Sequence, residues 1–208
     1  NVSTKVLEKS GKDIPENLEE IFIKQNNSVR AENVAKIEEV SKKYMNRDFV
    51  SDFSITPFKR LHNSMTAGFF GQKRSYYHDN KKIDEAWHLG VDWASVKKAD
   101  IYTINPGTVI FSDYLGIYGN TIIIDHILGL QTLYAHTSSS SVNVGDKVSS
   151  NQKIANTGVT GAVLGDHLHF GVLVQGVEVD PLEWMDKNWI KTRITDIIVD
   201  AKKVIDNK

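Results

Sequence analysis

The stretch from Phe53 to Val179 breaks into short apolar or alternating segments that are separated by turn residues. The clearest segments are Thr108–Ser112, Thr121–Asp125, Gln131–Ala135 and His167–Val174. The turn signals between them are Asn105-Pro106-Gly107, Gly119-Asn120, Gly145-Asp146 and Gln175-Gly176. Short strands spaced in this way predict a mainly β fold, with an antiparallel sheet arranged as a sandwich or small barrel. Helical segments do not alternate with the strands here, which disfavours Rossmann and TIM-barrel folds.

Residues 1–52 have a different pattern, rich in Lys, Glu and Asn with only one Gly and one Pro. Pro15 followed by acidic residues suits the start of a helix. Apolar residues at helical spacing then predict two amphipathic helices joined near residues 25–28. These residues are Leu18, Ile21 and Phe22, followed by Val34, Ile37, Val40 and Tyr44. Because each apolar stripe is narrow, we assign residues 1–52 to a helical region that packs on another surface and is a candidate regulatory or interaction segment.

Helical periodicity returns after Asp180-Pro181 and predicts a C-terminal helix over residues 186–208. Its broad apolar face comprises Ile190, Ile194, Ile197, Ile198, Ala201, Val204 and Ile205. This face fits docking on the helix's own domain, and it also fits contact with a partner subunit. Residues 53–185 between the helical regions form the expected main domain.

Charge and cysteine content exclude several classes of function. Lys and Arg total 25 against 26 Asp and Glu, so the net charge of −1 provides no basic surface to attract nucleic acid or anionic lipid. The absence of cysteine excludes thiol catalysis, thiolate zinc sites and disulfide scaffolds. No run of 18 apolar residues is present to span a membrane. Because the chain opens at Asn1 rather than Met, we expect a processed product, with any membrane anchor in a segment upstream.

Four of the seven histidines, together with Asp92, occur in patterns that suggest metal chemistry. His167 and His169 are two apart in a predicted strand, so their rings lie on the same face. His88 and Asp92 are four apart, a span of about 13 Å in a straight strand at ~3.3 Å per residue, so joint ligation of a metal requires a bend at Gly90. His136 ends a predicted strand, where chemistry is often located. Two imidazoles and one carboxylate can bind Zn²⁺ with a position open for water.

These motifs together resemble those of the LytM/lysostaphin-type zinc metallopeptidases. The matching segments, in chain order, are Pro106-Gly107-Thr108-Val109, Tyr118-Gly119-Asn120, Ile123-Ile124-Asp125-His126, Val144-Gly145-Asp146-Lys147-Val148 and Thr157-Gly158-Val159-Thr160-Gly161. They lie among His88-x-x-x-Asp92, Tyr134-Ala135-His136 and His167-Leu168-His169-Phe170, and Asp180-Pro181-Leu182 closes the domain. The departures are Asp166 where Pro is common, Gly171 where Glu is frequent, and Arg74 to Trp87, which is similar to an inserted hairpin.

The resemblance implies a role for each histidine. It makes His88, Asp92 and His169 the ligands of Zn²⁺, and His136 and His167 the catalytic histidines. His126 is not expected to be catalytic, and His62 and His78 match no functional position. The implied fold is a LytM-type antiparallel core with N-terminal and C-terminal helices.

The resemblance also implies a function, which is hydrolysis of the peptide cross-links of peptidoglycan. The near-neutral chain, with no wall-binding domain evident, favours D,D-endopeptidase action on D-Ala–diaminopimelate bridges over glycyl–glycine bridges. The segments flanking the motifs are most similar to Gram-negative, membrane-anchored members, some of which determine cell shape. We therefore expect a periplasmic or cell-envelope location, an inner-membrane anchor in a segment that precedes this sequence, and a role in cell-wall remodelling.

Two alternatives and a possible partner remain beside this interpretation. The chain would be a catalytically latent or inactive scaffold or activator if the N-terminal helices covered the cleft or if zinc did not bind. The apolar faces of the terminal helices would suit a homodimer, or a heterodimer with a paralogous LytM-type domain. A biotinyl or lipoyl carrier, suggested by Val144-Gly145-Asp146-Lys147-Val148, is disfavoured because it leaves the histidines unexplained.

Overall fold

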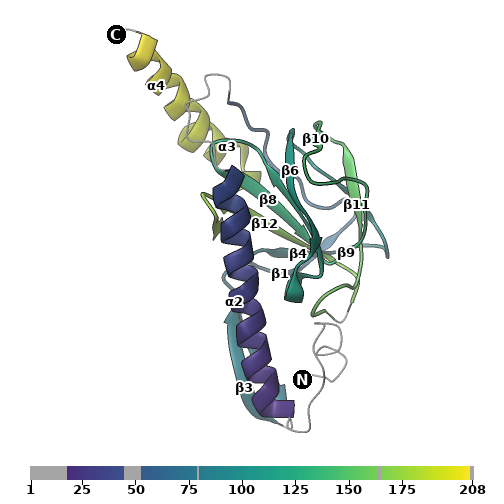
Figure 1. Ribbon diagram of the computed structural model, residues 1–208. Helices are drawn as coiled ribbons and strands as arrows, with labels where there is room; N and C mark the ends of the chain where they lie inside the picture. Colours follow the sequence, from purple (N-terminus) through teal and green to yellow (C-terminus); the bar gives the residue numbers. More distant parts are fainter. Residues whose placement is uncertain (1–17, 45–52, 79, 164, 207–208) are drawn as a thin grey trace.

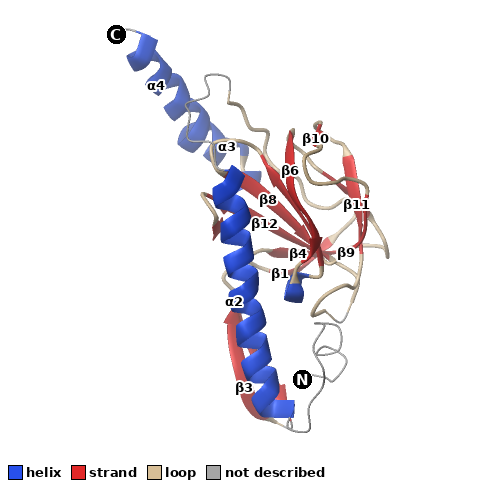
Figure 2. Ribbon diagram, viewed as in Figure 1, coloured by secondary structure: helices blue, strands red, loops and turns tan. Residues whose placement is uncertain are grey.

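The computed structural model describes residues 18–44, 53–78, 80–163 and 165–206 (Figure 1). Its main sheet is antiparallel, with strand order β1-β4-β12-β8-β7-β6-β10 and with β13 paired to β12. The strands are β1 (Met65–Gly68), β4 (Val91–Ala94), β6 (Gly107–Tyr114), β7 (Asn120–Asp125), β8 (Leu130–Ala135), β10 (Lys147–Val148), β12 (Leu168–Val174) and β13 (Val177–Val179). The predicted mainly β fold with helices at both ends is confirmed (Figure 2).

Two smaller sheets complete the β structure. A three-stranded sheet has the order β5-β11-β9, from Asp100–Tyr102, Lys153–Thr157 and Thr137–Ser140. A two-stranded hairpin consists of β2 (Lys73–His78) and β3 (Lys81–Trp87). The hairpin expected ahead of the first histidine motif is therefore present.

The two faces of the main sheet have different neighbours, as β12 illustrates. Leu168, Phe170 and Val172 alternate along β12 and belong to a core that includes Ile101 of β5 and Ile154 of β11. This core therefore lies between the main sheet and the three-stranded sheet. Residues of opposite parity, such as Leu173, belong to a second core that lies against the N-terminal helix. His169 shares the parity of Leu173, so it lies on the same sheet face as that helix.

The N-terminal helix α2 runs without interruption from Leu18 to Tyr44. The prediction of two helices joined near residues 25–28 was therefore wrong. Gln25, Asn26, Asn27 and Ser28 are polar, but no Gly or Pro occurs between Leu18 and Tyr44 to break the helix. The predicted start at Pro15 lies outside the described residues, as do the side chains of the first apolar group, from Leu18 to Phe22.

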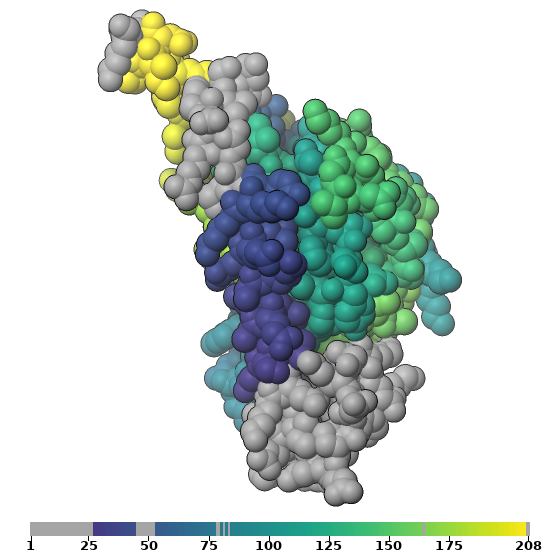
Figure 3. Space-filling view, in the orientation of Figure 1, coloured from purple at the N-terminus to yellow at the C-terminus, as the bar shows by residue number. Residues whose placement is uncertain are grey.

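Helix α2 docks on the domain through a stripe that includes polar residues. The buried members are Val29, Asn33, Ile37, Val40 and Ser41. Asn33 Oδ1 accepts a hydrogen bond from the backbone N–H of Ile117 at 3.1 Å, and Ser41 Oγ donates to Gln131 Oε1 at 2.7 Å. Val34, predicted to be in the stripe, is 42% exposed because it lies one position away from Asn33. Figure 3 shows the helix lying along the body of the domain.

The docking of α2 can be tested with Ile37, which is 1% exposed. We expect Ile37→Ala to lower the free energy of unfolding by about 2–5 kcal/mol, because a buried aliphatic side chain is lost and a cavity remains. The control Val34→Ala, on the exposed side, should change it by about 0.5 kcal/mol or less. Urea denaturation of both variants measures the difference. Equal, small effects would mean that α2 does not pack on the domain in solution.

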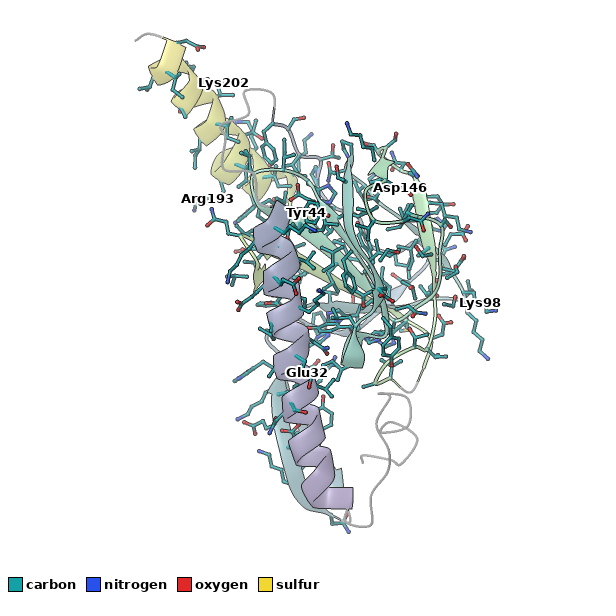
Figure 4. All side chains as sticks on the ribbon, in the orientation of Figure 1. Glu32, Tyr44, Lys98, Asp146, Arg193 and Lys202 are labelled. Carbon is teal, nitrogen blue, oxygen red and sulfur yellow. The ribbon has the colours of Figure 1, made fainter. Side chains whose placement is uncertain are left out.

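The C-terminal helical run follows the short 3₁₀ turn η2 (Glu183–Met185). Its members are α3 (Lys187–Ile190), the π-helical turn η3 (Lys191–Thr195) and α4 (Asp196–Asp206). Asp186 caps the start by accepting from the backbone N–H groups of Asn188 and Trp189. Ile190 is buried, whereas α4 buries no residue and extends away from the domain, as the positions of Arg193 and Lys202 show (Figure 4). Among the described helices, none combines the length and the apolar character needed to cross a membrane.

Candidate metal centre

Three side chains converge from the centre of the main sheet. Asp92 on β4 pairs in register with His169 on β12, so both project from one sheet face. His88 joins them because the chain bends at Gly90 before entering β4. A Cβ atom at Gly90 would lie 2.6 Å from the His169 ring, so this bend requires glycine. The bend predicted at Gly90 is therefore confirmed.

The ligand atoms of the three residues form a compact triangle. Asp92 Oδ1 lies 3.0 Å from His88 Nε2 and 3.0 Å from His169 Nδ1, and the two nitrogens are also 3.0 Å apart. Ligands in a tetrahedral zinc site are separated by about 3.3 Å when the bonds are near 2.0–2.1 Å. All three residues are 5% exposed. The spacing and burial fit one small divalent cation.

The hydrogen bonding of His88 supports the same conclusion. His88 Nδ1 lies 2.9 Å from the carbonyl oxygen of Phe69, which can only accept, so Nδ1 donates. The neutral His88 ring therefore presents the lone pair of Nε2 to Asp92 and His169. Burial by itself would raise the pKa of Asp92, but His169 and His88 hold it well below its ordinary value. Burial lowers the pKa of His169, although Asp92 opposes this effect. A carboxylate and two imidazoles thus direct electron pairs to one point, which is the donor set of a zinc site.

The second carboxylate oxygen of Asp92 has a separate partner. Arg74, from the hairpin strand β2, approaches Asp92 Oδ2 with Nη2 at 2.6 Å. Sequence reasoning missed this contact, because residues in two different sheets make it and no local spacing announces it. It leaves Oδ1 alone to face the two histidines.

His136 and His167 lie beside the triangle. Their ring centroids are 4.9 Å apart, and the His136 ring is 5.9 Å from that of His169. His167 Nε2 lies 3.7 Å from Asp92 Oδ1. The structure thus brings together all five residues that the sequence singled out.

Each of these two histidines has one ring nitrogen fixed by a backbone carbonyl. His136 Nδ1 donates to the oxygen of Thr160 at 3.0 Å, and His167 Nδ1 donates to that of Gly165 at 2.9 Å. In the neutral rings both Nε2 atoms are then free to accept a proton. Burial, followed by the neighbouring His169 and His167, holds the pKa of His136 well below its ordinary value.

The 3₁₀ turn η1 (Gly116–Tyr118) closes another side of the site. The Tyr118 ring packs edge-on against His169, with centroids 5.4 Å apart. Burial raises the pKa of Tyr118, so its hydroxyl stays protonated. Helix α2 holds this turn, because Gly116 has φ +44° and lies so close to Asn33 that a Cβ would be 2.4 Å from the amide. The sequence marked Tyr118 as part of a motif but did not indicate this position.

The remaining histidines lie outside the centre. His62 is exposed, and the side chain of His78 is outside the described residues. His126, which is not expected to be catalytic, is buried. Its Nδ1 donates to the oxygen of Pro106 at 2.7 Å, and its Nε2 lies 2.8 Å from Thr132 Oγ1.

His126 should make stability depend on pH. Burial lowers its pKa to about 4, whereas the unfolded value is near 6.5, so the unfolded chain binds more protons between these values. Stability is therefore complete above about pH 6.5 and falls as the pH drops toward 4, by on the order of 3 kcal/mol from this residue. We measure the free energy of unfolding by urea titration at several pH values with chelator present. Between pH 6.5 and 4 its slope against pH should be smaller in His126→Gln than in the unmodified protein, by up to about 1 kcal/mol per pH unit. Parallel slopes for the two proteins would contradict this role.

Comparison with known proteins shows a match to the Peptidase family M23 over residues 86–181. The chain is 33% identical over 131 residues to the peptidoglycan DD-endopeptidase ShyB of Vibrio cholerae. It is 35% identical over 113 residues to stage II sporulation protein Q of Bacillus subtilis. These matches cover 63% and 53% of this chain, but only 30% and 38% of the two relatives.

Solved structures give the same family resemblance. A zinc-containing peptidase from Vibrio cholerae is 33% identical with a TM-score of 0.51, over 59% of this chain and 36% of that chain. The catalytic domain of lysostaphin from Staphylococcus simulans is 25% identical with a TM-score of 0.51, over 60% of this chain and 94% of that chain.

Proposed function

The chain contains a Peptidase family M23 domain of the LytM type, and from this premise we propose that it is a zinc-dependent endopeptidase acting on peptidoglycan peptide cross-links. The observation that carries the proposal is the triangle of His88, Asp92 and His169, with sides of 3.0 Å. The similar structures include a zinc-containing peptidase from Vibrio cholerae, and one relative is a peptidoglycan DD-endopeptidase. We propose residues 53–185 as the peptidase domain, flanked by helical regions 1–52 and 186–208.

His88, Asp92 and His169 would hold the zinc ion. A bound zinc ion would supply a Lewis acid that polarises the scissile carbonyl and makes a water molecule more acidic. His136 and His167 lie on one side of the triangle, with ring centroids 4.9 Å apart. Substrate would therefore react between the triangle and this histidine pair.

The two histidines would divide the proton transfers. His136 is the more deeply buried and its lowered pKa keeps it neutral, so Nε2 would accept the proton of the attacking water. His167 Nε2 lies 3.7 Å from Asp92 Oδ1, beside the triangle. With a proton on Nε2, His167 would donate a hydrogen bond to the developing negative charge on the carbonyl oxygen.

We propose the D-Ala–diaminopimelate bridge as the bond that is hydrolysed. The DD-endopeptidase name of the Vibrio relative and the near-neutral charge of this chain support that choice. The test is mass spectrometry of purified cross-linked muropeptide dimers incubated with the zinc-loaded protein, with and without chelator. We expect dimers to become monomers only when zinc is present. Intact dimers alongside cleaved pentaglycine would assign the activity to glycyl bridges instead. The absence of both cleavage products would refute the proposed peptidase activity.

The proposed substrate indicates a location for the protein, and the exposed residues of α4 indicate a partner. An enzyme that cuts peptidoglycan cross-links must work in the cell envelope, and we propose the periplasm, with a role in wall remodelling and cell shape. The exposed residues Ile197, Val204 and Ile205 on α4 support pairing with a second LytM-type domain, either a second copy or a paralogue. Analytical ultracentrifugation would show a monomer if that pairing were absent.

A catalytically latent scaffold is the second candidate. The similarity to stage II sporulation protein Q supports this candidate. Helix α2 lies on the sheet face that bears His169, next to the site, but residues 1–17 are outside the described part of the chain. Removing residues 1–17 while keeping α2 should raise turnover if the N-terminal segment covers the cleft. A zinc content well below one ion per chain would instead support an inactive scaffold.

A further inference from the structure

Arg74 stands out because it contacts a residue of the triangle without being able to bind a metal itself. Its Nη2 lies 2.6 Å from Asp92 Oδ2, while Oδ1 lies 3.0 Å from both His88 and His169. The two oxygens of one carboxylate thus have separate partners. The Asp92 side chain is 8% exposed and the Arg74 side chain 36%, so the carboxylate end of this ion pair is shielded from water.

The chain leaves a space for this guanidinium group. Gly68 on β1 faces the contact, and a Cβ there would lie 2.5 Å from Arg74 Nη2 and 2.7 Å from Asp92 Oδ2. A side chain at position 68 would therefore separate Arg74 from Asp92. The glycine at position 68 thus provides the space that the contact between Arg74 and Asp92 requires.

The hairpin that carries Arg74 is fixed at both ends. At its base, the N–H of His88 donates to Gln72 O at 3.0 Å and the N–H of Gly71 donates to His88 O at 2.8 Å. Two residues beyond Arg74 on the same strand face, the Tyr76 hydroxyl accepts a hydrogen bond from Arg30 of α2 at 3.2 Å. The Arg30 guanidinium also lies 5.7 Å from the centre of the Tyr76 ring. Arg74 is therefore held relative to both the His88 backbone and helix α2.

We propose that Arg74 is a positioning residue that holds the Asp92 carboxylate so that only Oδ1 faces the metal. This inference rests on the proposed zinc site and deepens it. Planar guanidinium groups fix carboxylates through directional hydrogen bonds, which a lysine ammonium reproduces only in part. By occupying Oδ2, Arg74 would prevent two-oxygen binding and would draw negative charge away from the metal-facing oxygen. Both effects would keep the ion electrophilic and a coordination position open for substrate.

The test compares Arg74→Ala, Arg74→Lys and the control Lys73→Ala. Lys73 is the preceding residue on the same strand, and it pairs with Glu85 rather than with the site. We expect Arg74→Ala to weaken zinc binding about 10–100-fold in a chelator competition and to lower kcat with little change in KM. The absorption spectrum of the cobalt-substituted protein should change, because a second Asp92 oxygen would reach the ion. Arg74→Lys should recover part of each property, and Lys73→Ala should match the unmodified protein.

Two outcomes overturn the inference. Unchanged zinc affinity and cobalt spectrum in folded Arg74→Ala would show that Arg74 does not position Asp92. A rise in KM alone would make Arg74 a contact for a substrate carboxylate instead. If the unmodified protein binds zinc but hydrolyses nothing, the proposed function fails, while zinc affinity and the cobalt spectrum still test Arg74. Circular dichroism confirms folding, and Arg74→Lys provides the test if Arg74→Ala does not fold.

Discussion

Replacing His169 with alanine is expected to abolish both zinc binding and cross-link hydrolysis. His169 is one of only three residues in the triangle, and it is 5% exposed at the centre of the main sheet. Zinc sites with four ligands bind with roughly 10–16 kcal/mol, or about 3 kcal/mol per ligand, so one loss should weaken affinity at least about 100-fold. Because the metal contributes several kcal/mol to lowering the barrier, turnover should fall by at least about 10³-fold.

The measurement combines metal analysis with the muropeptide assay. We expect about one zinc ion per chain in the unmodified protein and almost none in His169→Ala after dialysis. His62→Ala is the matched control, since His62 is exposed and belongs to no part of the centre. Asp92→Asn offers a second route, because it keeps the shape of the side chain but removes its charge. Full zinc occupancy in both His169→Ala and Asp92→Asn would contradict the assignment.

Replacing His136 or His167 should have the second largest effect and should leave zinc in place. Neither residue belongs to the triangle, but their rings are 4.9 Å apart beside it. Loss of a positioned proton donor or acceptor lowers turnover by about 10²–10⁴-fold. The double variant should be little worse than either single variant, because the two residues act in one proton-transfer sequence.

His136 needs a careful choice of substitution. Its φ of +63° is in the left-handed region, which asparagine tolerates better than most residues. His136→Asn therefore checks that any loss in His136→Ala comes from chemistry rather than from misfolding. Steady-state hydrolysis and zinc content are measured on the same samples. Unchanged turnover in zinc-loaded His136→Asn and His167→Ala would remove both residues from the mechanism.

Local patterns in the sequence predicted the strands and the candidate ligands for a physical reason, whereas the choice of His88, Asp92 and His169 as ligands came from the family resemblance. Strand alternation fixes which side chains share a face, so His167 and His169 had to lie together. The wide spacing of His88 and Asp92 required a bend, and Gly90 was the residue able to supply it. Cross-strand register then brought Asp92 opposite His169.

The features that the sequence did not predict depend on contacts between distant parts of the chain. Asn33 and Ser41 are polar, yet they are buried in α2 because Ile117 and Gln131 provide hydrogen-bond partners far along the chain. A search for apolar spacing alone therefore placed Val34 in the stripe and divided the helix. The contact of Arg74 with Asp92 likewise joins two different sheets.

The proposed activity depends most directly on one ion bound by three side chains. Anomalous diffraction at the zinc absorption edge, from crystals grown with zinc, locates that ion without reference to activity. We predict one strong peak about 2 Å from His88 Nε2, Asp92 Oδ1 and His169 Nδ1. Zinc-saturated crystals with no peak among these three atoms would contradict it.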